Sequence, residues 1–165
     1  MRSYNCSRAP RRAAGLALAC LLFPLLSSAQ SSSSVLTVGQ VPKLSVKRGA
    51  SVEVRLPVEL RSGYHVNSNT PSESYLIPLR LTWDESLLKV ESVKYPKPEM
   101  EKYPFAEQAL SVFTGNFEIA TRFTAPKGAA SGPNIVTGKL RYQACSNVAC
   151  LPPRTLDVQL SVVIQ

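Results

Sequence analysis

Cys145 and Cys150 are the residues of this sequence whose type and spacing could do chemistry. Four residues separate them in "LRYQACSNVACLPPRTLDVQL", between two segments in which polar and apolar residues alternate. Two neighbouring thiols can close a disulfide, and a thiolate can attack the disulfide of another protein and exchange with it. The pair is therefore either a structural crosslink or a site that transfers electrons.

The alternation around the cysteines predicts a β-hairpin. Leu140, Tyr142 and Ala144 share one face of the segment before the first cysteine, and the second cysteine leads into the last alternating segment. Facing residues of a hairpin lie about 4.5–5.5 Å apart at Cα, a distance that a disulfide can span. So short a ring stabilises by only about 2 kcal/mol and crosslinks strands that the hairpin already joins. The spacing therefore favours chemistry over a structural role.

The first 29 residues have the features of a secretory signal peptide. Four arginines precede an apolar run over 13–26, and Ser27-Ser28-Ala29 is a small-residue cleavage site. Because Pro24 interrupts the run, which is shorter than the roughly 20 apolar residues of a spanning helix, we expect no stable membrane span. A lipoprotein anchor at Cys20 is the less favoured alternative, because Ala17 stands where a lipoprotein signal has leucine.

Cleavage after Ala29 would remove Cys6 and Cys20, leaving one possible internal disulfide in a compartment where disulfides persist. It would also remove four arginines and no acid, so the formal net charge falls from +8 to +4. The remaining basic residues are scattered, and nucleic acid is not an expected partner. A flexible serine-rich leader over 30–34 then precedes a single domain over 35–165.

Alternation with a period of two predicts that this domain is all-β. In "SVEVRLPVEL", residues 51–60, apolar residues occupy every second position. The pattern recurs in "YLIPLRLTW" (75–83), "FEIATRF" (117–123) and "TLDVQLSVVI" (155–164), and no segment shows a helical period. Turn-forming clusters separate these runs. We therefore expect an immunoglobulin-like antiparallel β-sandwich.

Two segments resemble the N-terminal periplasmic domain of the thiol:disulfide interchange protein DsbD. "YQACSNVACLPP" is similar to the active-site hairpin of that family, and "GYHVNSNTPSESYLIPLRLTW" is similar to its early strand–turn–strand segment. The resemblance covers residues 35–165. It implies an immunoglobulin-like periplasmic domain that relays reducing equivalents through Cys145 and Cys150, like a protein-disulfide reductase, without a metal or an organic cofactor.

The resemblance also implies partners. In full-length family members, a transmembrane domain takes electrons from cytoplasmic thioredoxin, and a thioredoxin-like domain passes them to the N-terminal domain. That domain then reduces periplasmic disulfide isomerases and cytochrome c maturation proteins. Because this chain ends at Gln165 directly after an alternating segment, we expect periplasmic thioredoxin-like proteins and a membrane electron transporter to act in trans.

Family precedent assigns the roles of individual residues. Cys150 would form the mixed disulfides with partners, and Cys145 would resolve them. The family also shields its cysteines with an aromatic residue on a mobile cap loop. The longest stretch without a strand prediction, "YPKPEMEKYPFAEQAL" over 95–110, contains Phe105 as the best match for this residue and Tyr103 as the alternative.

This sequence departs from the family pattern in two places. Family members carry acidic residues directly before the cap aromatic, whereas Tyr103-Pro104 precede Phe105 here. Glu101 and Glu107 are the nearest acids and are therefore the candidates for a carboxylate that tunes the thiols. The loop between the cysteines is also one residue shorter than in the family, which can change the strain and the potential of the bond.

Other interpretations of the same residues stay open. The cysteine pair can be a structural disulfide in a secreted immunoglobulin-like interaction module. Zinc normally takes four ligands, and the mature chain offers two cysteines and His65 in another segment, so no metal site is expected. His65 is interpreted as a structural or hydrogen-bonding residue, because no nucleophile can be placed beside it from sequence. Trp83 and Tyr142 are expected in the core.

Overall fold

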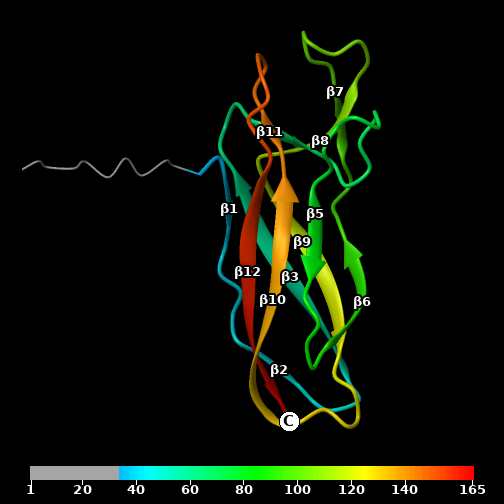
Figure 1. Cartoon of the computed structure of the whole chain (residues 1–165), viewed down its shortest axis with the longest axis vertical. Helices are drawn as coiled ribbons and strands as arrows, with labels where there is room; N and C mark the ends of the chain where they lie inside the picture. Colours follow the sequence, from blue (N-terminus) through cyan, green and yellow to red (C-terminus); the bar gives the residue numbers. More distant parts are fainter. Residues whose placement is uncertain (1–33) are drawn as a thin grey trace, which may run out of the picture. The chain divides into compact units, whose positions relative to one another are not determined.

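A computed structural model describes residues 34–165, which form β-strands joined by turns and loops (Figure 1). The predicted signal peptide (1–29) and residues 30–33 of the predicted leader lie outside the described residues. Within the described part, no helix is long and apolar enough to cross a membrane. The strands are β1 Leu36–Val38, β2 Leu44–Val46, β3 Ser51–Leu60, β4 His65–Asn67, β5 Arg80–Trp83, β6 Lys89–Lys94, β7 Glu99–Glu101, β8 Leu110–Thr114, β9 Asn116–Thr124, β10 Gly132–Tyr142, β11 Ala144–Cys145 and β12 Arg154–Ile164.

These strands form three sheets. Sheet A has the order β1-β3-β9-β6, and sheet B has the order β2-β12-β10-β5. The two sheets are the layers of a sandwich, and the small sheet C, β11-β4-β8-β7, lies at one end of it, at the top of Figure 1. Neighbouring strands are antiparallel except β2, which pairs parallel to β12. The predicted all-β, immunoglobulin-like sandwich is confirmed, whereas sheet C was not predicted.

The sandwich forms because its strands bury every second side chain. In β3, Val54, Leu56 and Val58 are buried, while Glu53 and Arg55, at the alternate positions, are exposed. The same alternation holds in β9, β10 and β12, as the sequence predicts. The main core cluster draws on all three sheets and contains Leu36, Leu56, Val58, Leu60, Val66, Leu79, Leu81, Phe113, Ile119, Leu140, Tyr142, Ala144 and Val158. Sheet C is therefore attached to the sandwich through a shared apolar core.

The structure corrects two expectations about segments. The alternating run over 75–83 is a strand only from Arg80, and Tyr75 is 76% exposed. Pro78 has no N–H to donate to a sheet, and the chain before β5 instead bonds to Asn67, whose side-chain amide donates to the Ile77 carbonyl. In the stretch over 95–110, where no strand was predicted, β7 pairs antiparallel with β8.

Candidate functional site

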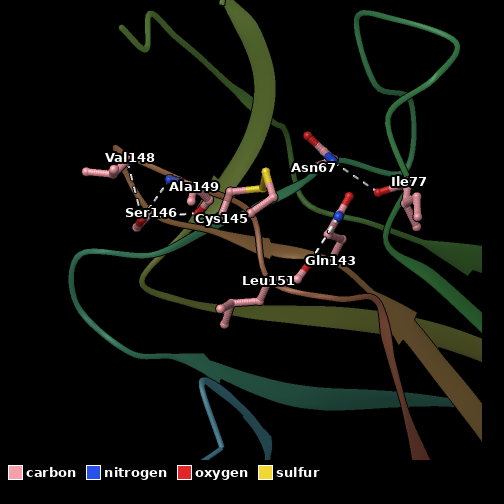
Figure 2. Close-up of a disulfide and its surroundings, with 9 residues drawn as sticks. Asn67, Ile77, Gln143, Cys145, Ser146, Val148, Ala149 and Leu151 are labelled. Carbon is pink, nitrogen blue, oxygen red and sulfur yellow. Dashed lines mark hydrogen bonds between the residues drawn. A yellow bond between two sulfur atoms is a disulfide. The ribbon is translucent and has the colours of Figure 1, made fainter. Parts of the chain in front are cut away.

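The two cysteines form a disulfide at the end of the β10–β12 hairpin (Figure 2). Beyond Tyr142 the first arm leaves sheet B, and β11 pairs with β4 of sheet C. Cys145 and Cys150 face each other as an isolated antiparallel bridge. Their Cα atoms are 3.9 Å apart, closer than the 4.5–5.5 Å expected for facing residues of a regular ladder. The predicted hairpin and its crosslink are present, with a tighter approach of the two backbones than expected.

Hydrogen bonds close the turn between the cysteines independently of the sulfur bond. The Ser146 hydroxyl accepts from the backbone N–H groups of Val148 and Ala149, both at 3.2 Å, and the Ser146 N–H donates to the Ala149 carbonyl at 2.9 Å (Figure 2). Below the disulfide, the Leu151 N–H donates to the Ala144 carbonyl at 2.8 Å. The loop is therefore held in its conformation by its own polar groups, and the sulfur bond is not its only closure.

The two cysteines differ in exposure. Cys145 is 1% exposed, because β11 packs into the shared core, whereas Cys150 is exposed on the returning arm. The residues beside Cys150 are apolar and exposed as well, with Val148 at 86% and Leu151 at 38%. One sulfur-bearing residue is thus open to another protein and the other is enclosed.

His65 is brought beside this pair, an arrangement that sequence reasoning missed. In the β4–β11 register, His65 lies directly opposite Cys145, and it is 2% exposed. Its Nε2 atom has no hydrogen-bond partner. The signal for this proximity is absent from local sequence, because β4 has three residues and β11 has two, too few to show a period.

The two cap candidates stack on this histidine. The Tyr103 ring lies 3.9 Å from the His65 ring, centroid to centroid, with 20° between their planes. Phe105 stacks on Tyr103 at 5.5 Å and lies 6.3 Å from His65. Tyr103 is 5% exposed and Phe105 is 44% exposed. Tyr103 is therefore the inner ring of the stack, and Phe105 is the outer ring that reaches solvent.

Glu101 is the carboxylate that contacts this stack. The Tyr103 hydroxyl donates a hydrogen bond to Glu101, and burial together with that bond raises the pKa of Tyr103. Burial lowers the pKa of His65, and the charge of Glu101 opposes this shift in part. Glu107 contributes a backbone carbonyl, which accepts from the Lys102 ammonium. Of the two acids singled out in the sequence, Glu101 is the one in contact with the aromatic stack.

A hollow of about 340 Å³ opens beside the stack. Its walls include His65, Glu101 and Tyr103, together with Thr114 of β8 and Asn147 of the hairpin turn. Tyr142 is buried in the main core, as the sequence predicts. Its hydroxyl has no hydrogen-bond partner. Among residues 34–165, no three His, Cys, Asp or Glu side chains gather into a metal-binding group.

These features define an immunoglobulin-like β-sandwich domain with a half-exposed disulfide at one end. Over residues 32–161 the sequence matches the family described as "Thiol:disulfide interchange protein DsbD, N-terminal", and the chain belongs to this family.

Solved structures provide two further similarities. The reduced N-terminal domain of DsbD from Neisseria meningitidis is 19% identical, with a TM-score of 0.46, over 69% of this chain and 80% of that one. The N-terminal periplasmic domain of ScsB from Proteus mirabilis is 18% identical, with a TM-score of 0.48, over 76% of this chain and 43% of that one. No curated protein sequence matches the chain.

Proposed function

We propose that this protein is a periplasmic thiol–disulfide exchange domain that relays reducing equivalents through Cys145 and Cys150. The observation that carries the proposal is the unequal exposure of the pair: Cys145 is 1% exposed, and Cys150 is open to solvent. Exchange requires one sulfur that a partner can reach and a second sulfur close enough to resolve the mixed disulfide. A purely structural crosslink does not require this asymmetry.

The proposed cycle needs no cofactor other than the cysteine pair. A donor thiolate attacks the sulfur of Cys150, the bond to Cys145 breaks, and a second donor thiol releases the donor as a disulfide. The resulting dithiol carries two electrons. Cys150 then attacks the disulfide of an acceptor, and Cys145 attacks Cys150, which releases the reduced acceptor and restores the disulfide.

The surface around Cys150 supports a protein partner. The apolar residues Val148 and Leu151, which precede and follow Cys150 in the sequence, are exposed, and exposed apolar residues are common on surfaces that other proteins cover. We assign thioredoxin-like periplasmic proteins as partners, with a membrane electron transporter as the source of electrons. Export by the predicted signal peptide places the domain in the same compartment.

Phe105 and Tyr103 are proposed to act as the cap of this site. Tyr103 is held by its stack on His65 and its bond to Glu101, whereas Phe105 is 44% exposed at the outer end of the stack. Phe105 is therefore the ring that a docking partner displaces, and Tyr103 is the anchor on which it rests.

The reduction potential of the disulfide tests the proposal. Equilibration with glutathione or dithiothreitol buffers, followed by thiol trapping, should give a value between about −270 and −180 mV, the range of exchange-active pairs. A value below about −300 mV is typical of structural disulfides and would instead favour a secreted interaction module.

A trapping experiment with matched variants tests the assignment of the two cysteines. Cys145→Ser leaves the exposed thiol of Cys150 without its resolving partner and should accumulate a mixed disulfide with an added thioredoxin-like protein. Cys150→Ser leaves only the buried thiol and should accumulate none. Equal trapping by both variants would contradict the proposed roles.

A further inference from the structure

His65 and Cys145 share one enclosed part of the site. They are directly opposed in the β4–β11 register. Directly opposed residues of an antiparallel pair carry their side chains on the same face of the sheet, with Cβ atoms about 4.5–5.5 Å apart. The two residues are 2% and 1% exposed, respectively. The imidazole therefore lies beside the cysteine that a partner cannot reach.

The buried Nε2 atom of His65 lacks a hydrogen-bond partner, and a buried polar nitrogen in that state is unfavourable. While the disulfide is closed, the sulfur of Cys145 carries no hydrogen and cannot donate to the imidazole. Reduction converts this sulfur to a thiol, which is a hydrogen-bond donor. The redox change itself thus produces a donor on the residue directly opposite the imidazole whose Nε2 atom has none.

The surroundings keep the imidazole neutral. Burial lowers the pKa of His65, only partly opposed by the charge of Glu101, so the neutral form prevails near pH 7. From β8, the residue opposite His65 is the uncharged Thr114, whose hydroxyl donates to Glu99 at 2.9 Å. The titratable groups around the imidazole are Tyr64, Glu99, Glu101, Tyr103 and Cys145. Neutral imidazole is the form that accepts a proton.

We propose that His65 is the acid–base residue for Cys145 in the exchange reaction. The inference rests on the proposed function and extends it to a residue that the cysteine motif does not contain. A buried thiol is a poor nucleophile until it loses its proton. Cys145 is enclosed, so the base that activates it has to come from the protein, and His65 is the neutral base across the strand pair.

The step balances in protons and electrons. In the mixed disulfide, the Cys145 thiol passes its proton to His65, and the resulting thiolate attacks the sulfur of Cys150. The Cys145–Cys150 bond forms, the bond from Cys150 to the partner breaks, and the partner's sulfur leaves as a thiolate with the electron pair. The imidazolium then returns its proton to the leaving thiolate or to water. In the reverse direction the same imidazolium protonates Cys145 as it leaves.

Two phases of thiol release separate this step from the first attack. The reduced protein is mixed in a stopped-flow instrument with the aromatic disulfide 5,5′-dithiobis(2-nitrobenzoate), and the coloured thiolate is recorded. The first release reports attack by Cys150, and the second reports resolution by Cys145. Cys145→Ser should show the first release alone, which identifies the second phase.

His65→Gln and His65→Phe test the histidine; the second variant keeps an aromatic ring to stack on Tyr103. Both should slow the second phase by at least about tenfold at pH 7, the lower range for general-base catalysis, and leave the first phase within about twofold. Near pH 10, where a thiol ionises unaided, their rates should approach that of the unsubstituted protein. Thr114→Val is the matched control: it is nearly isosteric, faces His65 from β8, and should leave both phases unchanged.

The outcomes distinguish the two proposals. If the unsubstituted protein shows only one release, the exchange function itself is wrong, and the role of His65 falls with it. If it shows both releases and the His65 variants retain the second rate at pH 7, the exchange function stands and the role of His65 is overturned. A slower second phase that does not recover at high pH would also overturn it, because loss of structure rather than loss of a base would explain the change.

A measurement without substitution covers the case in which the variants do not fold. His65 is the single histidine of the sequence, so its ring protons are identified directly in a proton NMR spectrum. In the reduced protein their pH titration should show a second inflection, from ionisation of Cys145, that the disulfide form lacks. Identical titrations in the two redox states would overturn the proposal.

Discussion

The sandwich of sheets A and B and the disulfide end of the domain differ in how they distribute polar and apolar side chains. We define the disulfide end as sheet C, its loops over 68–79 and 102–109, and the hairpin over 143–153. In the sandwich, apolar residues alternate into the core and the ion pairs, such as Arg122–Glu91, lie at the surface. Five of the eight exposed large hydrophobic residues of the described part lie at the disulfide end, namely Tyr75, Met100, Phe105, Val148 and Leu151, and the other three are Leu87, Val90 and Ile135.

The buried polar atoms show the same contrast. In residues 34–165, three buried side-chain atoms lack a hydrogen-bond partner: His65 Nε2, Asn67 Oδ1 and the Tyr142 hydroxyl. Two of these residues belong to β4, and the third stands where β10 ends and the hairpin begins. Unsatisfied buried groups reduce stability, and exposed apolar side chains contribute little to it. Their concentration at one end indicates that the sandwich supplies the stability that the site end does not.

The largest effect should come from a core residue of the sandwich. Phe123 is 0% exposed and meets the edge of Trp83 at 5.2 Å between ring centroids. Phe123→Ala should lower the free energy of unfolding by about 3–5 kcal/mol, because it removes apolar contacts and leaves a cavity. The matched change at the disulfide end, Phe105→Ala, should lower it by less than about 1 kcal/mol, because that ring is already 44% exposed. Similar losses in urea denaturation would break the contrast between the two regions.

The second effect concerns the disulfide itself. Cys145→Ala combined with Cys150→Ala should lower the free energy of unfolding by about 2 kcal/mol, the loop-closure value for so short a ring. The fold should persist, because the hydrogen bonds of Ser146 and the β10–β12 pairing remain. Denaturation of the unsubstituted protein under reductant provides the control and should give a similar loss. Unfolding of the double variant at 25 °C would show that the disulfide end does hold the sandwich together.

The contrast between the regions also explains what sequence reasoning could predict. β3, β9 and β12 were predicted nearly to their ends because their alternation is local, and one face of each is buried. The hairpin and the cysteine pair were predicted because spacing alone places two nearby thiols together. These features depend on residues that are close in sequence.

The remainder of the site depends on residues that are distant in sequence. β4 and β11 pair positions 65–66 with positions 144–145, and strands this short carry no periodic signal. The stack of Tyr103 on His65 likewise joins the β7–β8 loop to β4. The cysteines and the cap candidates could therefore be found in the sequence. The placement of Cys145 opposite His65 and the stacking of Tyr103 on the same histidine follow only from the tertiary structure.

A smaller effect tests the buried histidine through pH. Because burial lowers the pKa of His65, the unfolded chain takes up this proton first as the pH falls below the ordinary value of 6.5. In the disulfide form, the free energy of unfolding should therefore decrease as the pH falls from about 7 to about 5, with a slope no steeper than one proton per molecule. His65→Phe should remove this slope in urea denaturation, and a slope that survives the substitution would assign the pH dependence to another group.

The smallest effect belongs to the sandwich surface and begins at a lower pH. Hydrogen bonds from Thr124 and Arg122 lower the pKa of Glu91 below its ordinary value of 4.5. The ionised form is therefore favoured in the folded state, so its stabilisation is present above pH 4.5 and is lost as the pH falls through the lowered pKa. Glu91→Gln should flatten only this acidic part of the stability curve, and added salt should reduce the difference, because the pair is exposed and screened.

The two pH windows then assign one titration to each region. Between about pH 7 and 5 the stability curve should respond to His65→Phe and not to Glu91→Gln, since a carboxylate of lowered pKa stays ionised throughout this range. Below pH 4.5 Glu91→Gln should change the slope as well, whereas the slope from His65 ends only once the folded state also takes up the proton. A change between pH 7 and 5 in Glu91→Gln would mean that the ionisations of the two regions are linked, and the division between a stabilising sandwich and a chemically active end would fail.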